Sequence, residues 1–201
     1  MFIIFFKMGK TLEELFGRHY LSTEQLMCQG VPFSRIDRWL SDGSIKKIDR
    51  GVYGLPNVKH DDFALIQYRY DRCIFSGITA LSLHGLSDHI SESYHITLPQ
   101  GYNPSSLKDC PWELSITRSV PKIYNLGRTE IATEQGNEIT VYDKERSLCD
   151  ILRGKGMPPF IVKAAMKRYF TSSNKDPELL RYYAEELHVS DRISFFLELY
   201  A

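Results

Sequence analysis

Residues 31–56 read VPFSRIDRWLSDGSIKKIDRGVYGLP, and this stretch decides how the first part of the chain folds. Pro32 stands where a helix would begin and Gly43 just past where it would end, so the spacing predicts a helix between them. Apolar residues recur at helical spacing and define one face of this helix: Phe33, Ile36 and Leu40. The opposite face is polar and carries Ser34, Arg35, Arg38 and Ser41.

A β-hairpin is predicted directly after this helix. Gly51 lies at its tip, in the sequence DRG, where glycine adopts a positive φ without steric strain. Four apolar residues are expected to anchor the hairpin to its domain: Ile45, Ile48, Val52 and Leu55. Tyr53 is expected to cover the base of the hairpin, and Trp39 to pack at the edge of the preceding helix. The remaining polar positions concentrate positive charge: Lys46, Lys47 and Arg50.

Two shorter helices are predicted upstream, over residues 10–20 and 22–30. Ser22 is a typical N-cap, and Gln25 three residues later completes a capping box. Two helices joined by a tight turn that contains glycine, with basic and hydroxyl residues outward on the second, form the helix-turn-helix pattern. The hairpin that follows makes this a winged version.

The pattern predicts binding to double-stranded DNA. An α-helix fits the width of the B-DNA major groove, so Ser34, Arg35 and Arg38 are expected to enter that groove. The basic residues of the hairpin are expected to bind phosphate or probe the adjacent minor groove: Lys46, Lys47 and Arg50. One such domain covers a single half-site, so two molecules are expected to pair on an inverted repeat. The alternative is a hairpin that docks on an acidic protein partner, with DNA binding incidental.

The distribution of charge divides the chain. The whole sequence balances 25 Lys and Arg against 25 Asp and Glu, but residues 1–59 hold nine basic and six acidic residues. The change of composition around LPNVKHDD predicts two domains, a DNA-binding domain over residues 1–58 and a second domain over residues 59–201. Residues 1–7 form an apolar leader that is unlike a signal peptide, and whether they are native is left open.

The second domain is predicted to be mixed. Strands are expected in YHITLPQG, WELSITRS and NEITVYD, and helices in residues 61–70, SGITALSLHGLSD and DKERSLCDILRG. Asp143 is the expected N-cap of the last of these. Three further helices complete the chain, so the fold class is α+β, with a larger mixed C-terminal domain that ends in helices.

The residues favour a binding protein over an enzyme. The histidines and the four cysteines lack the spacing of a metal site, and no phosphate-binding loop motif is present. Cys149 lies between Leu148 and Ile151 on an apolar helix face, which favours a buried thiol over a nucleophile paired with a distant histidine. His84 is expected to cap or pack the end of its helix. No catalytic residue, metal or cofactor is therefore predicted.

Four segments occur in an order and at spacings that resemble the AbiEi antitoxins of bacterial abortive-infection systems: RGVYGLP, FSGITALSLHGLSD, YHITLPQG and TVYDKERSLCDILR. The resemblance covers nearly the whole chain from about Thr11. It is most specific in the hairpin with GVY and in the helices that contain ALSLHGL and DKERSLCD. The residues after about Pro158 contain no matching motif.

The resemblance implies a type IV antitoxin that represses its own operon. The winged helix-turn-helix would bind inverted repeats in the promoter, and the C-terminal domain would counter a nucleotidyltransferase toxin without need of a stable complex. It does not specify the operator, the target of the toxin, the mechanism of neutralisation or the oligomeric state. The four widely scattered cysteines fit free thiols in a reducing cytoplasm, so a cytoplasmic protein is predicted.

Overall fold

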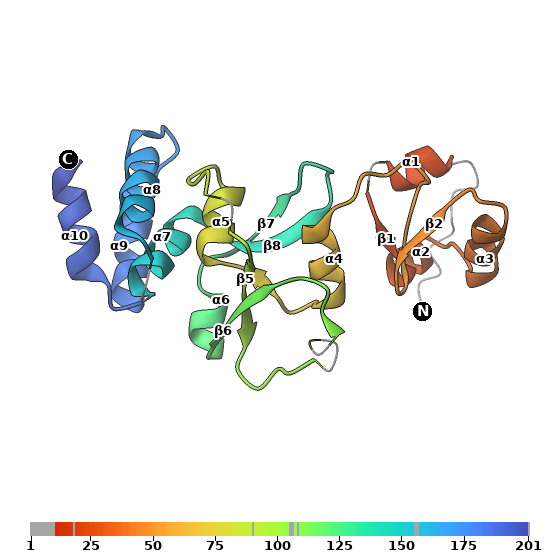
Figure 1. Cartoon of the computed structure of the whole chain (residues 1–201), viewed down its shortest axis with the longest axis horizontal. Helices are drawn as coiled ribbons and strands as arrows, with labels where there is room; N and C mark the ends of the chain where they lie inside the picture. Colours follow the sequence, from red (N-terminus) through yellow and green to blue (C-terminus); the bar gives the residue numbers. More distant parts are fainter. Residues whose placement is uncertain are drawn as a thin grey trace. The chain divides into compact units, whose positions relative to one another are not determined.

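The computed structural model describes residues 11–17, 19–89, 91–104, 107, 109–154 and 157–200, so the leader at residues 1–7 lies outside the described residues. Helices and two sheets confirm the predicted α+β class (Figure 1). The chain forms two compact units. Unit 1 contains the described residues up to Asp71 together with Ile131–Ile139, and unit 2 contains Arg72–Glu130 and the described residues from Thr140 onward. The boundary predicted after residue 58 therefore lies inside unit 1.

Unit 1 begins with three helices and a small antiparallel sheet. The elements, in chain order, are α1 (Leu12–Phe16), β1 (Leu21–Ser22), α2 (Thr23–Cys28), α3 (Phe33–Ser41), β2 (Lys46–Asp49), β3 (Val52–Gly54) and α4 (Asp62–Arg69). The sheet order is β1-β3-β2, so the predicted hairpin is present and gains one further strand, β1. Strand β2 is an edge strand, and the register between β2 and β3 shifts between Lys47 and Asp49.

Local sequence signals explain where these elements begin and end. The side chain of Ser22 accepts a hydrogen bond from the Gln25 amide, and the Gln25 side chain accepts one from the Ser22 amide, which confirms the predicted capping box of α2. Thr11 and Glu14 form the same arrangement at α1. Gly51 has a φ of 70°, as the hairpin tip requires, and the Thr23 amide and hydroxyl both donate to its carbonyl.

The core of unit 1 is formed by one side of the helices α1, α2 and α3 and by the inner face of the hairpin. Its buried residues are Leu15, Phe16, Leu21, Leu26, Val31, Ile36, Ile45 and Tyr53, and Trp39, Leu40 and Leu55 pack against them. The expected packing roles of Tyr53 and Trp39 are thereby confirmed. The expectation that Phe33 shares the buried face of its helix is wrong: Phe33 is 53% exposed, because it stands at the first position of α3, where the helix enters from solvent.

A buried polar cluster joins the segment Ile131–Ile139 to the rest of unit 1. The Asp61 carboxylate accepts hydrogen bonds from the Thr133 hydroxyl at 2.6 Å, the Asn137 amide group at 2.7 Å and the backbone of Ala64 at 3.2 Å. The side-chain oxygen of Asn137 accepts from the Tyr20 amide at 2.7 Å. Because Asp61 and Asn137 are each 3% exposed, this cluster satisfies polar groups that would otherwise be buried without partners.

Unit 2 places helices against a mixed sheet. Its elements, in chain order, are β4 (Ile74–Phe75), α5 (Gly77–Leu83), β5 (Tyr94–Pro99), β6 (Leu114–Ser119), α6 (Pro121–Asn125), β7 (Arg128–Ala132), β8 (Glu138–Tyr142), α7 (Lys144–Arg153), α8 (Pro159–Thr171), α9 (Pro177–Glu186) and α10 (Ser190–Leu199). The sheet order is β6-β5-β4-β8-β7, with β5 parallel to β6 and β4 parallel to β8. The distal ends of β7 and β8, with the turn between them, are counted in unit 1.

Helix α7 is the central helix of unit 2. Leu148, Cys149 and Ile151 lie in a core shared with α5, α8, α9 and α10, and Asp143 caps the helix as predicted (Figure 1). Asp150 forms an ion pair with Arg146, at 3.1 Å and one turn away on the same helix. Arg146 is 1% exposed and is the largest of the fully buried side chains, which the sequence did not indicate.

Candidate nucleic-acid interface

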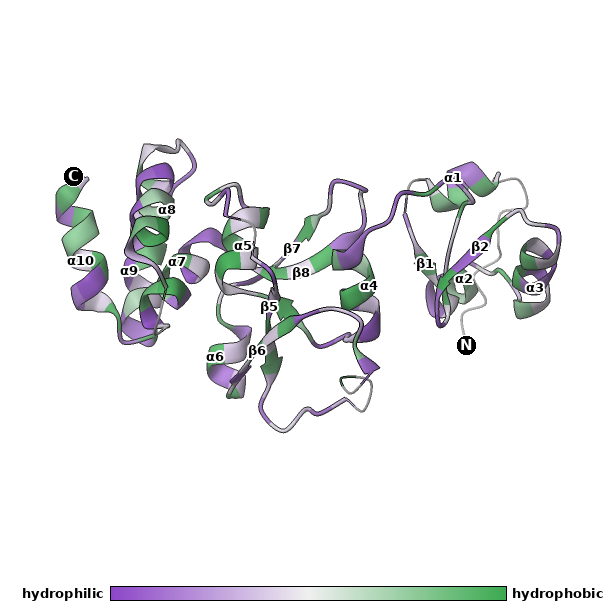
Figure 2. Cartoon of the chain, in the orientation of Figure 1, coloured by the Kyte–Doolittle hydropathy of each residue, from purple (hydrophilic) through white to green (hydrophobic). Residues whose placement is uncertain are grey.

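Helix α3 presents the predicted polar face to solvent. Ser34, Arg35 and Arg38 are all exposed, and Ile36 between them is fully buried and holds the helix to the core. Helical geometry aligns Ser34 and Arg38 on one stripe, with Arg35 on one side of it and the exposed Asp37 on the other. Figure 2 shows hydrophilic and hydrophobic residues alternating along α3. The helix can therefore bring a hydroxyl and two guanidinium groups to a surface without unpacking the domain.

The hairpin exposes all three predicted basic residues, but it does not place them together. Lys46 lies opposite Gly54 and Lys47 opposite Tyr53. Since consecutive residues of a strand point to opposite faces, the two lysines lie on different faces of the hairpin. Both are exposed because β2 is an edge strand, and Arg50 is exposed at the tip. A polyanion on one face of the hairpin would therefore meet one lysine and Arg50.

Acidic residues close to these positions are engaged in other interactions. Asp49, next to Arg50, forms a bidentate ion pair with Arg69, at 3.0 and 2.8 Å. Asp42, after the end of α3, accepts hydrogen bonds from the amide and hydroxyl of Ser44, and these bonds lower the pKa of its carboxyl group. Because the Arg69 guanidinium compensates Asp49, the tip of the hairpin keeps the charge of Arg50.

Two apolar side chains that flank the connection between α2 and α3 are exposed. Met27 in the last turn of α2 is 58% exposed, and Phe33 at the start of α3 is 53% exposed. In protein–DNA complexes an exposed phenylalanine ring can contact the methyl group of thymine. The sequence pattern did not identify Phe33 as an exposed residue, because its position fits the spacing of the buried face.

The described residues contain no group of three or more His, Cys, Asp or Glu side chains that could hold a metal ion. Cys149 is fully buried, and burial raises the pKa of its thiol to about 12, so the thiolate is strongly disfavoured. His84 ends α5 and donates from Nε2 to the carbonyl of Tyr142 at 2.7 Å, so its side chain packs the end of the helix against β8, one of the two roles expected of it. Within the described ranges no helix has the length and apolarity needed to cross a membrane.

Comparison with known proteins finds similarity at the level of structure. No family model matches the chain, and no curated protein sequence matches it. Among solved structures, the chain is similar to the Rv2827c protein from Mycobacterium tuberculosis, with a TM-score of 0.54 and 14% sequence identity. The match covers 90% of this chain and 72% of that protein. At this level of identity, the likeness shows that the two chains share a fold.

Proposed function

We propose that unit 1 is a winged helix-turn-helix that binds double-stranded DNA. The observation that carries the proposal is the exposed face of α3, with Ser34, Arg35 and Arg38, followed directly by a basic edge hairpin. The element order α1-β1-α2-α3-β2-β3 and the sheet order β1-β3-β2 support this assignment.

In this proposal α3 lies in the major groove. Ser34, in the first turn, would reach base edges, and an arginine can donate two hydrogen bonds to O6 and N7 of guanine. The hairpin would lie along the backbone, with Arg50 at its tip bound to phosphate or reaching the minor groove. Two copies would occupy the two halves of an inverted repeat.

We further propose that the protein is an antitoxin that represses its own operon. The motif order that resembles the AbiEi antitoxins supports this role, in which the C-terminal part of the chain counters a nucleotidyltransferase toxin. A downstream gene for a nucleotidyltransferase and inverted repeats upstream of this gene are the genomic features expected of such an operon.

The DNA assignment is tested by fluorescence anisotropy with the full chain and a labelled duplex from the region upstream of its gene. Arg35→Ala and Arg38→Ala should each weaken binding by about 1–3 kcal/mol and reduce the preference for that sequence over scrambled DNA, if the residue reads a base. Arg181→Ala is the matched control, because Arg181 is an exposed arginine on α9 of unit 2. Unchanged affinity for the upstream duplex in both α3 variants would overturn the DNA-binding assignment.

A second candidate function is direct docking of the basic hairpin on an acidic protein. The opposite-face arrangement of Lys46 and Lys47 supports it, because a protein partner can surround both faces of an edge hairpin. Gel-shift titrations with and without the product of the neighbouring gene distinguish the two functions. Lysine variants that lose only the protein partner would favour docking.

A further inference from the structure

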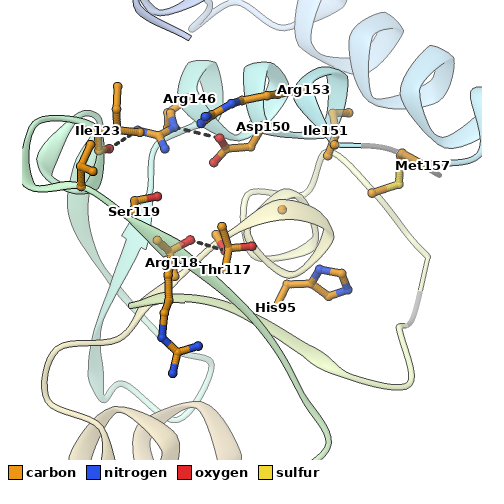
Figure 3. Close-up of a pocket in the computed structure, with 15 residues that line it drawn as sticks. His95, Thr117, Arg118, Ser119, Ile123, Arg146, Asp150, Ile151, Arg153 and Met157 are labelled. Carbon is orange, nitrogen blue, oxygen red and sulfur yellow. Dashed lines mark hydrogen bonds and ion pairs between the residues drawn. The ribbon is translucent and has the colours of Figure 1, made fainter. Parts of the chain in front are cut away.

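Unit 2 contains a pocket of about 530 Å³, with both polar and apolar side chains in its lining, whose walls come from the β-sheet and from α7 (Figure 3). Arg146, Asp150 and Arg153 line the α7 side, while His95 and Arg118 come from the strands on the facing side. Three arginines and a single carboxylate leave the lining with a positive balance. The volume is that of a small-molecule site.

Arg146 forms a rigid part of this pocket. Its Nη1 donates to the carbonyls of Ile123 at 2.7 Å and Leu126 at 2.8 Å, and its Nε donates to Asp150. The guanidinium also lies over the ring of Tyr142, 4.2 Å from the ring centre. These contacts fix a buried positive charge in one orientation before any ligand arrives, which lowers the entropic cost of binding.

Arg153 and Arg118 are the accessible charges. Arg153 is exposed, lies two turns after Arg146 on the same helix, and makes no hydrogen bond or ion pair with the described residues. Arg118 on β6 is exposed and donates to the side chain of Asn103, so it is tethered only to another exposed residue. Arg153 can therefore turn toward a ligand without breaking the core. The guanidinium of Arg118 points away from Arg146 and Asp150 in Figure 3, so it would have to release Asn103 and change its rotamer to reach the same ligand.

Hydroxyl groups supply further donors between the two walls. Thr117 and Ser119 on β6 line the pocket, and Thr97 donates to Ser76 across its floor at 3.0 Å. Hydroxyl and guanidinium groups together are typical of sites that hold phosphate oxygens. Asp150 adds a carboxylate oxygen that can accept a hydrogen bond from a ligand hydroxyl.

We propose that this pocket binds a small phosphorylated molecule, with its phosphate between Arg153 and Arg118 and close to the buried charge of Arg146. The proposal concerns unit 2 and does not depend on the DNA assignment of unit 1. The phosphate could belong to inorganic pyrophosphate or to a monoester such as a nucleotide, and the test separates these sources.

Isothermal titration calorimetry of the full chain provides the test, with pyrophosphate, AMP and ribose 5-phosphate as probes and sulfate as the reference anion. We expect saturable binding of one molecule per chain for at least one phosphate probe, in preference to sulfate. Tight binding of pyrophosphate alone identifies an inorganic ligand, and preference for AMP identifies a nucleotide. Equal, weak heats for all four anions would overturn the proposal.

Variants locate the site. Arg153→Gln and Arg118→Gln should each lower the affinity for the phosphate probe by about tenfold, because each variant lacks one charged hydrogen-bond donor to the phosphate. Arg128→Gln, an exposed arginine at the start of β7 outside the pocket, should bind as the unmodified chain does. Circular dichroism checks that each variant is folded. If Arg35→Ala and Arg38→Ala lose the probe while Arg153→Gln keeps it, the anion binds to α3 and the pocket assignment is wrong.

Discussion

Ile36 and Phe33 stand three residues apart on α3, but Ile36 is fully buried and Phe33 is 53% exposed. Replacing Ile36 with alanine should therefore lower the free energy of unfolding by about 2–5 kcal/mol, because it opens a cavity in the core of unit 1. The same change at Phe33 should alter it by less than about 1 kcal/mol. Urea denaturation of the two variants measures the difference.

The Phe33→Ala variant also distinguishes an effect on the stability of unit 1 from an effect on DNA binding. If α3 enters the major groove, this variant should bind the upstream duplex more weakly while its stability stays nearly unchanged, because a solvent-facing ring next to Ser34 would contact the DNA. Equal loss of stability in the Phe33 and Ile36 variants would contradict the exposure of Phe33.

Asp61 is the residue that holds the polar cluster of unit 1 together. Asp61→Ala should lower the free energy of unfolding of unit 1 by about 1.5–3 kcal/mol or more, because Thr133 and Asn137 lose a charged acceptor and remain buried. Thermal unfolding measures the change. Glu134→Ala, an exposed acid in the same segment, should leave the unfolding midpoint nearly unchanged and serves as the control.

At the scale of the elements, α5 and β8 are joined by a bond that depends on pH. Burial lowers the pKa of His84 below its ordinary value of 6.5, and its neutral ring donates to Tyr142. The unfolded chain takes up a proton near pH 6.5, whereas the folded chain takes it up only at lower pH. The contribution of His84 to stability is therefore present above pH 6.5 and is lost as the pH falls toward the folded pKa.

The temperature at the thermal unfolding midpoint of the full chain should accordingly decrease as the pH is lowered from about 7.5 to about 5.5. His95, whose pKa is also lowered by burial, acts in the same direction. His84→Gln should show a smaller fall than the unmodified chain, since glutamine can donate to Tyr142 but does not titrate in this range. An identical fall in both proteins would show that His84 is not responsible.

The sequence predicted those elements whose signals are local. The capping box at Ser22, the glycine at position 51 and the N-cap at Asp143 act within a few residues, and the structure confirms each of them. Strand β1 was missed because two residues carry no periodic pattern. The burial of Arg146 was missed because its carbonyl partners, Ile123 and Leu126, come from a segment that spacing along α7 does not indicate.

Only part of the candidate interface could be predicted from the sequence. Helical spacing and the edge hairpin indicated the six exposed polar residues, but helical spacing alone placed Phe33 on the buried side. The inclusion of Ile131–Ile139 in unit 1 was also unexpected, since it depends on hydrogen bonds between residues that are distant in sequence. Such contacts leave no periodic signal in a single chain.

At the scale of the whole molecule, a chain with no net charge should bind DNA through a small number of phosphates. The proposed surface has five basic side chains: Arg35, Arg38, Lys46, Lys47 and Arg50. Because a duplex on one face of the hairpin meets only one of the two lysines, the slope of log K against log salt should be no steeper than about −3.6 per copy. Titrations between about 50 and 200 mM salt measure it.

Lys46→Ala and Lys47→Ala should each reduce the steepness of that slope by about one unit if the lysine contacts phosphate. Because the two lysines lie on opposite faces of the hairpin, the structure indicates that only one variant should show the full reduction. A reduction of one unit in both would place DNA on both faces of the hairpin.

The cluster around Asp61 also bears on the order in which the protein is made. A ribosome delivers Tyr20 and Asp61 long before Thr133 and Asn137, the residues that complete their hydrogen bonds. During that interval the helices and the hairpin of unit 1 can form, but its buried carboxylate and the Tyr20 amide lack their partners. The nascent chain must therefore wait for Arg72–Glu130 of unit 2 to be synthesised before its first-made part is finished, and a chain cut short before Asn137 would yield an incomplete unit 1.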